Sequence, residues 1–167
     1  MSDRLVEHGT FVVERRYPAS PARVFAAWTD AGAKQIWMDD PDYKSDGTAY
    51  ELDFRVGGHE RFGGLTPAGA SYRCEARYYD IVPDHIVPDH RIVHSYEMHE
   101  GGDLMSVSLT TVVIAPDQDG TKLTYTEQGA FLDGIEKPED REQGVSWMLG
   151  NLGKYLASHA AGRPGRS

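Results

Sequence analysis

Hydrophobic and polar residues alternate with a period of two over most of the chain, and a helical period appears only near its two ends. Residues 9–17 predict a first strand. Ser20 and Pro21 then supply an N-cap and a first-turn proline, which together indicate the start of a helix. Asp30 can cap a second short helix that carries Trp37. The chain is therefore predicted to begin with a strand and two short helices.

The middle of the chain is predicted to consist of strands and turns. Residues 50–56 alternate most cleanly, with the even-numbered positions apolar and the odd-numbered positions charged. Gly57 and Gly58 then predict a tight hairpin turn. Further strands are predicted over 59–62, 72–82, 91–98, 104–115 and 121–129. Strands at regular intervals, joined by turns that contain glycine, indicate an antiparallel meander.

One long helix, over residues 138–161, is predicted to close the fold. It carries a one-sided apolar stripe, formed by Val145, Met148, Leu149, Leu152 and Leu156. A lone antiparallel sheet must cover one face, and only this helix is long enough to do so. Gly144, Gly150 and Gly153 lower helix stability, which indicates either close approach to the sheet or simple tolerance. A curved sheet over one helix tends to leave a cavity, so the order of elements favours small-molecule binding.

Two segments are predicted to carry no chemistry. Residues 81–85 and 86–90 have the same sequence, Ile-Val-Pro-Asp-His, in a unit far shorter than any structural repeat. We interpret this tandem copy as a longer hairpin loop, because added loop length costs little free energy. Residues 162–167 are rich in Gly, Arg and Pro and are predicted to form a flexible tail.

The composition fits one folded domain. The protein has 167 residues, of which 40% are hydrophobic and 10% aromatic, enough to build a core. A formal net charge of −9 disfavours nucleic acid and anionic lipid surfaces as partners. Cys74 is the only cysteine, which excludes an intrachain disulfide and a CxxC metal site. No apolar run reaches the length of a membrane span, and we expect a cytoplasmic protein.

Several stretches together carry a family signature: 18–29, 50–58, 80–83, 91–98 and 120–129. With them the chain resembles the SRPBCC, or START-like, superfamily, and within it the bacterial proteins named after the activator of Hsp90 ATPase. The resemblance implies an α+β helix-grip fold (START/Bet v 1-like). This fold has a curved antiparallel sheet of about seven strands, two short helices and a long C-terminal helix over a cavity. It implies a single domain over residues 1–161.

The resemblance implies no shared catalytic residues, because the superfamily includes polyketide cyclases, lipid carriers, hormone receptors and toxin-sequestering proteins. The Hsp90 name comes from a eukaryotic co-chaperone domain, so assigning that activity here would be an analogy of fold. The chain departs from the family pattern twice. The Ile-Val-Pro element is duplicated, and Val145 follows Gly144 where relatives often have Trp, with Trp147 two positions further on. Both changes bear on the shape of the cavity.

Two groups of polar side chains are candidates for chemistry. Glu127 shares a face with Leu123 and Tyr125, where burial would raise the pKa of its carboxyl and make it a proton donor or base. The alternative is that Glu127 pairs with an arginine or caps a backbone N–H. His94 and Tyr96 share another strand face and could orient a ligand carbonyl or perform acid–base work. The alternative is a hydrogen-bonded, inert histidine.

Aromatic and aliphatic residues are expected to line the cavity, although the same residues also suit an ordinary core. The candidate cavity residues are Trp28, Trp37, Phe54, Phe62, Tyr72, His94, Tyr96, Tyr125, Glu127, Met148 and Leu152.

Metal binding and nucleophilic catalysis have little support. The histidines and aspartates of residues 84–90 match no tight metal site. Cys74 has no evident activating base, and Ser106 and Ser108 lie outside any Gly-x-Ser-x-Gly motif. We therefore expect no metal and no cofactor.

The leading hypothesis is a domain that binds a small apolar or aromatic molecule between the sheet and the final helix. Two alternatives stay open. One is an enzyme of the cyclase or hydrolase type that uses Glu127 or His94 as acid or base. The other is a protein-binding module like the Hsp90 activator, supported only by the acidic segment 39–46. A homodimer also stays open.

Overall fold

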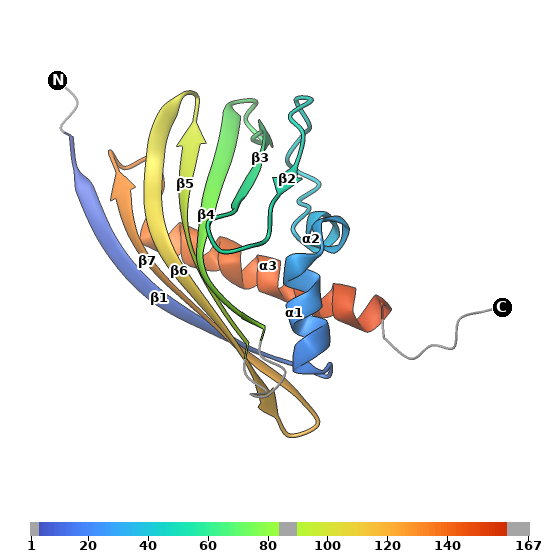
Figure 1. Cartoon of the computed structure of the whole chain (residues 1–167). Coiled ribbons are helices and arrows are strands. Elements are labelled where there is room, and N and C mark those ends of the chain that lie inside the picture. The colour runs from blue at the N-terminus through green and yellow to red at the C-terminus, as the bar shows by residue number, and fades with distance from the viewer. Residues whose placement is uncertain (1–3, 84–89, 160–167) are drawn as a thin grey trace.

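The computed structural model describes residues 4–83 and 90–159. Within them, seven strands form one antiparallel sheet in the order β1-β7-β6-β5-β4-β3-β2 (Figure 1). The elements, in chain order, are β1 (Val6–Tyr17), α1 (Pro21–Thr29), α2 (Ala31–Trp37), β2 (Glu51–Leu52), β3 (His59–Leu65), β4 (Ser71–Pro83), β5 (His90–Glu100), β6 (Asp103–Asp117), β7 (Gly120–Leu132) and α3 (Pro138–Ser158). The predicted α+β helix-grip class is confirmed. The predicted tail, 162–167, lies outside the described residues.

The two short helices begin where the capping residues predict. The Ser20 hydroxyl accepts a hydrogen bond from the backbone N–H of Arg23 at 3.3 Å, and Pro21 occupies the first turn of α1. The Asp30 carboxylate accepts from the backbone N–H of Ala33 at 2.8 Å and starts α2. Each cap satisfies a backbone donor that the helix itself leaves free.

The predicted strand over 50–56 is wrong for most of its length. Only Glu51–Leu52 pairs with β3. From Asp53 onward the backbone turns back on itself: the Arg55 N–H donates to the Asp53 carbonyl, and the Gly58 N–H donates to the Arg55 carbonyl. Val56 is consequently 58% exposed. The alternating pattern was present, but turn hydrogen bonds replaced the ladder that a strand needs.

The remaining strands agree with prediction, apart from a few residues at their ends. The tandem repeat at 81–90 starts within β4. Its last residue, His90, is the first residue of β5 and pairs with Pro83, the last residue of β4. The predicted loop therefore joins β4 to β5, but residues 84–89 lie outside the described part of the chain. None of the described helices has the length and apolar character needed to cross a membrane.

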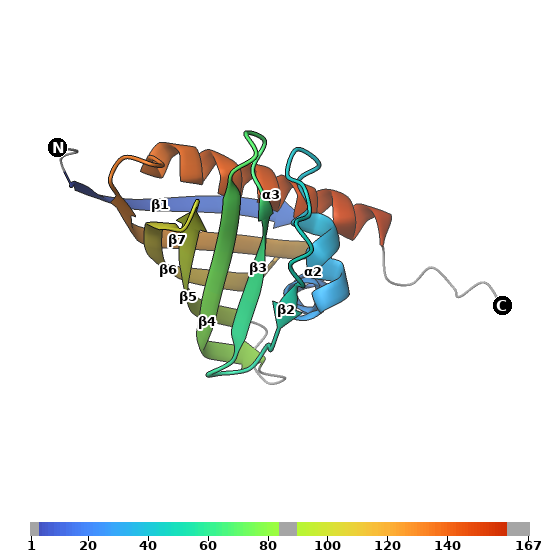
Figure 2. The same ribbon diagram turned by 90° about the horizontal axis from the view of Figure 1, so that it is seen from above.

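Helix α3 lies against the concave side of the sheet, which curves around it (Figures 1 and 2). The buried residues of its stripe are Val145, Leu149, Leu152 and Leu156. A side chain at Gly153 would lie 3.3 Å from the Tyr17 ring, so this glycine permits a close approach between α3 and β1. A side chain at Gly144 or Gly150 would meet no atom within 4 Å. Close approach to the sheet thus explains Gly153, whereas Gly144 and Gly150 are simply tolerated in the helix.

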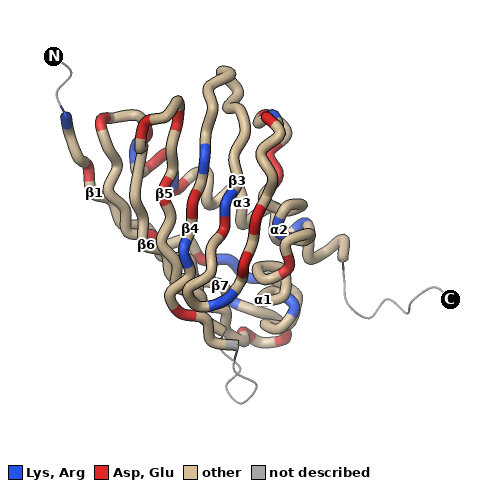
Figure 3. Tube along the Cα trace, turned by 45° about the horizontal axis from the view of Figure 1, so that its top comes forward, with Lys and Arg blue, Asp and Glu red and all other residues tan. Residues whose placement is uncertain are grey.

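Charged residues of both signs interleave along the strands of the sheet (Figure 3). Arg73 and Glu75 of β4 lie 3.4 Å apart, and Arg61 of β3 lies 3.7 Å from Glu51 of β2. Solvent screens such exposed pairs, which contribute at most about 1 kcal/mol each. The side chains that can support a site therefore lie on the concave face.

Candidate functional site

A cavity of about 190 Å³ lies between the concave face of the sheet and α3. Its wall is formed by side chains from both short helices, from β3, β4, β5 and β7, and from α3. Alternate residues of each strand point to this face, so neighbouring strands place Phe62, Cys74 and Met98 in one row across the sheet. Gly144 also lines the cavity and is exposed, so the cavity reaches the surface beside it.

Part of the predicted set lines this cavity. These residues are Trp28, Phe62, His94, Tyr96, Tyr125 and Met148.

The other predicted residues do not touch the cavity. Trp37 and Leu152 are fully buried in the core. Phe54 packs edge-on against Tyr78, at a ring distance of 4.9 Å, because the chain turns away from the sheet at Asp53. Tyr72 and Glu127 are also outside the wall. These five predicted residues therefore lie outside the wall of this cavity.

Tyr72 lies at the far end of β4, although it shares a face with Cys74 and Ala76. Its ring packs edge-on against Tyr43, with ring centres 5.1 Å apart. The period of two gives the correct face, but it cannot say how far along the strand the cavity extends.

Charged residues that the sequence analysis did not select form one part of the wall. Lys34 of α2 is 3% exposed and Glu60 of β3 is 4% exposed, and the ammonium lies 2.8 Å from the carboxylate. The Lys34 Nζ also donates to the Tyr78 hydroxyl at 3.2 Å, and the Tyr50 hydroxyl donates to Glu60. The Tyr78 hydroxyl also donates to Glu60, at 3.4 Å, so this carboxylate is held by one cation and two hydroxyls, as a buried charge requires.

The pair keeps both of its charges despite burial. Burial opposes the charged form of Lys34, but the Glu60 carboxylate and the Tyr78 hydroxyl together outweigh this and raise the pKa of Lys34. Burial likewise acts to raise the pKa of Glu60, but Lys34 and the Tyr50 hydroxyl together outweigh it and lower that pKa. The pair thus enters the wall as an ion pair with no net charge.

A second buried network surrounds Glu127, whose side chain has no exposed surface. Its carboxylate accepts from the hydroxyls of Tyr96 at 2.6 Å, Ser108 at 2.8 Å and Tyr125 at 3.1 Å. The Arg141 guanidinium lies 3.3 Å away. Glu127 thus has the arginine partner that was the alternative to an acid–base role.

Arg141 connects this network to the cavity, which its own side chain lines. It donates to the Tyr96 hydroxyl at 2.8 Å and to the Ser106 hydroxyl at 2.8 Å, and it pairs with Glu136. A helical period places Arg141 four residues before Val145, on the apolar stripe of α3. A cation inside an apolar stripe was the sequence signal that could have identified it. Lys34, three residues before Trp37 on α2, carried the same signal.

His94 lies in the wall near the Lys34–Glu60 pair and is 7% exposed. Burial lowers the pKa of His94 to about 4, with Lys34 adding to the effect and Glu60 opposing it. The imidazole is therefore neutral at pH 7. Its Nδ1 atom has no hydrogen-bond partner among the described residues.

Acidification is expected to destabilise the protein through His94. The unfolded chain binds a proton near the ordinary pKa of 6.5, whereas native His94 does so only near pH 4. Stability is thus unaffected by His94 above pH 6.5 and falls as the pH drops through this window. We expect a loss of about 2 kcal/mol between pH 7 and pH 5 from this group.

Urea unfolding of the wild type and of His94→Phe at pH 7 and pH 5 measures the loss of stability that is due to His94, because the contributions of the other titrating groups cancel between the two proteins. An equal loss of stability in both proteins would show that His94 does not cause it.

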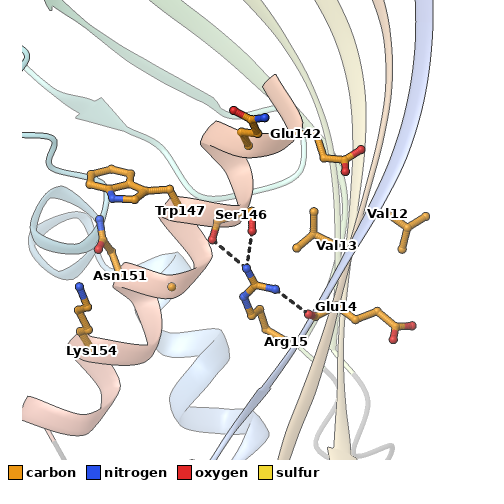
Figure 4. A pocket seen from close by; sticks show the side chains of 11 residues that line it. Val12, Val13, Glu14, Arg15, Glu142, Ser146, Trp147, Asn151 and Lys154 are labelled. Atoms are coloured by element: carbon orange, nitrogen blue, oxygen red, sulfur yellow. Dashed lines mark hydrogen bonds between the residues drawn. The ribbon is translucent and has the colours of Figure 1, made fainter. Parts of the chain in front are cut away.

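A second hollow, of about 700 Å³, lies between β1 and a different face of α3 (Figure 4). It is an open groove in which Arg15 reaches from β1 to the Ser146 carbonyl at 3.1 Å. Trp147 on its rim is 47% exposed. Most of its lining is polar or charged, so this groove does not enclose a small apolar molecule and is not the candidate site.

Cys74 lines the cavity, but burial raises the pKa of its thiol, which disfavours the reactive thiolate. Among residues 4–83 and 90–159, no group of three or more His, Cys, Asp or Glu residues is arranged to hold a metal ion. The described wall offers ion pairs, hydrogen-bonding groups and apolar surface.

Comparisons with known proteins agree with this architecture. The family model described as Activator of Hsp90 ATPase homolog 1-like protein matches residues 18–157. The Mll3558 protein from Rhizobium loti is 45% identical, with a TM-score of 0.80, over 91% of this chain and 99% of that one. A putative uncharacterized protein from Rhizobium leguminosarum is 39% identical, with a TM-score of 0.84, over 93% and 99% of the two chains. No curated protein matches the chain.

Proposed function

Because the chain belongs to the family of Activator of Hsp90 ATPase homolog 1-like proteins, we propose that it uses the helix-grip fold to bind a small, largely apolar molecule. The observation that carries this proposal is the cavity of about 190 Å³ under α3. An apolar cavity of about 150 Å³ binds benzene, whereas drug-sized ligands need about 300 Å³ or more. The volume therefore suits a molecule with a single ring.

The wall supports the same occupant. Phe62, Met98 and Met148 supply apolar and polarisable surface, and methionine adapts to rings of different shape. The exposed Gly144 beside them marks a point at which a ligand could enter. The charged groups of the wall are already paired with buried partners. A ligand therefore does not need a charge of its own to balance them.

Toluene is a suitable probe, followed by NMR of the methionine methyl groups. We expect saturable shifts at Met98 and Met148. Gly144→Leu places a side chain at the opening of the cavity, where its Cβ atom meets no protein atom within 4 Å, and should weaken toluene binding about tenfold. Leucine is also the better helix former by up to about 1 kcal/mol, so folding should not suffer.

Gly150→Leu is the matched control. Gly150 lies on the same helix and is equally free of neighbours, but it lines the outer groove. It should bind toluene like the wild type. If toluene and other single-ring probes produce no saturable shift in the wild type, the proposed function is wrong. If both leucine variants bind equally well, the ligand does not use this opening.

A cyclase or hydrolase has weaker support. A general acid or base must reach the substrate, and Glu127 is fully buried with its oxygens occupied. His94 does line the cavity, but a pKa of about 4 makes it a weak base at pH 7. The chaperone partner, the homodimer and the cytoplasmic location stay predictions.

A further inference from the structure

Two polar groups in the wall of the cavity lack hydrogen-bond partners. The indole N–H of Trp28 and the Nδ1 atom of His94 are both buried without a partner among the described residues. Trp37, which packs against Trp28, shows the usual arrangement, because its indole N–H donates to the Ala27 carbonyl at 2.9 Å. Buried polar groups are nearly always satisfied, so two unsatisfied ones in one cavity wall call for an explanation.

The chemistry of these groups limits what can satisfy them. The Trp28 N–H can only donate, so its partner must be an acceptor. A neutral imidazole offers one donor and one acceptor, so His94 can bond to a hydroxyl or a carbonyl oxygen. Within the described residues, the Nδ1 atom of His94 has no such partner. An oxygen atom is therefore the partner that suits both groups.

The charges of the wall further exclude an ionic ligand. The Lys34 ammonium is paired with Glu60, and the Arg141 guanidinium is paired with both Glu127 and Glu136. An anion entering the cavity would find no unpaired cation among these groups, and a cation would find the buried carboxylates of Glu60 and Glu127 already bonded to protein donors. Transfer of an unpaired charge from water into such a site is strongly unfavourable.

The position of His94 lets one small molecule use both kinds of surface. On β5, His94 is followed on the same face by Tyr96 and then by Met98. A ring held against Met98, Met148 and Phe62 thus has the imidazole within the same cavity, at the side of the Lys34–Glu60 pair. An oxygen substituent on that ring would lie in the same cavity as the imidazole and would supply its missing partner after a small turn of the His94 ring, because Nδ1 is buried in the present rotamer.

Building on the proposed function, we propose that the ligand is an uncharged single-ring molecule with a hydrogen-bonding oxygen, of the phenol or aryl carbonyl class. His94, whose ring lines the cavity, recognises the oxygen. The apolar residues bind the ring itself. Recognition by an oxygen contact distinguishes such a ligand from a plain hydrocarbon of equal size.

The affinities of toluene and phenol for the wild type and His94→Phe test this. In a purely apolar site phenol binds more weakly than toluene, because its hydroxyl loses hydrogen bonds to water. We expect the wild type to bind phenol at least as tightly as toluene. His94→Phe should shift the ratio of the two affinities about tenfold in favour of toluene, with toluene binding retained.

His94→Gln guards against a variant that fails to fold, because glutamine keeps a donor and an acceptor at similar size. It should preserve part of the preference for phenol. A wild-type measurement adds a test of charge: benzaldehyde should bind at least tenfold more tightly than benzoate at pH 7.

The outcomes separate the two proposals. A wild type that prefers toluene tenfold over phenol, an unchanged ratio in His94→Phe, or tighter binding of benzoate than benzaldehyde would each overturn the inference about the oxygen. Toluene binding would survive those results and leave the proposed function intact. Failure of toluene, phenol and benzaldehyde alike would overturn the proposed function itself.

Discussion

Replacing Arg141 by methionine is expected to lower the free energy of unfolding by about 3–5 kcal/mol. Methionine keeps the bulk of the arginine stem but removes the guanidinium, which lies 3.3 Å from the fully buried Glu127 carboxylate. The hydroxyls of Tyr96 and Ser108 would remain as hydrogen-bond donors, but no cation would balance the charge. Urea unfolding at pH 7 measures the loss.

Two further variants show whether the loss comes from the stranded carboxylate. Adding Glu127→Gln to Arg141→Met removes that charge while keeping the size of the side chain, and it should recover more than about 1 kcal/mol. Arg16→Met breaks the pair with Asp117, which has a 2.7 Å contact but an exposed arginine. It should cost less than about 1 kcal/mol. Similar losses at Arg16 and Arg141 would contradict a role for burial.

Lys34→Met is expected to destabilise the protein by about 3 kcal/mol for the same reason at the other side of the cavity. Glu60 is 4% exposed, and Lys34 is the cation that holds it, at 2.8 Å. The Tyr50 and Tyr78 hydroxyls contact Glu60 as well and soften the effect. Thermal or urea unfolding of the two proteins measures the difference.

The pH dependence of that variant provides a sharper test. Without Lys34, burial raises the pKa of Glu60, so native Glu60 takes up a proton at a pH where the unfolded chain is still ionised. The deficit of Lys34→Met should therefore shrink as the pH falls from 7 towards 5. Lys122→Met, which breaks a partly exposed pair with Glu14 at 3.4 Å, should show little effect. A deficit that stays constant with pH would mean that the lost packing, rather than the charge of Glu60, causes it.

The order of elements could be predicted from the sequence because its signals are local. Ser20 and Asp30 each act on a backbone group three residues away, and strand alternation depends on the geometry of neighbouring residues. The segment 50–56 shows the limit of such signals. Its alternation is as clear as that of the true strands, but whether a strand forms depends on the hydrogen bonds that its backbone finds, and here a turn supplies them.

The candidate site shows the second limit. Alternation placed His94, Tyr96 and Glu127 on the concave face, as the structure finds. It could not show that Glu127 lies behind the wall or that Tyr72 lies beyond its end, because a period of two gives a face and no distance along it. The family resemblance implied the cavity, and only packed side chains define its volume.

The sequence alone determined the class of fold, the order and approximate bounds of its elements, and the face on which most cavity residues lie. The tertiary structure decided which charges meet. Lys34 and Glu60 are 26 residues apart, and Glu127 and Arg141 are 14 apart, on different elements. Whether a buried charge is paired, and whether an imidazole or indole is left without a partner, depends on neighbours brought together from distant parts of the chain. Those contacts, rather than residue types, fix the electrostatics of the cavity.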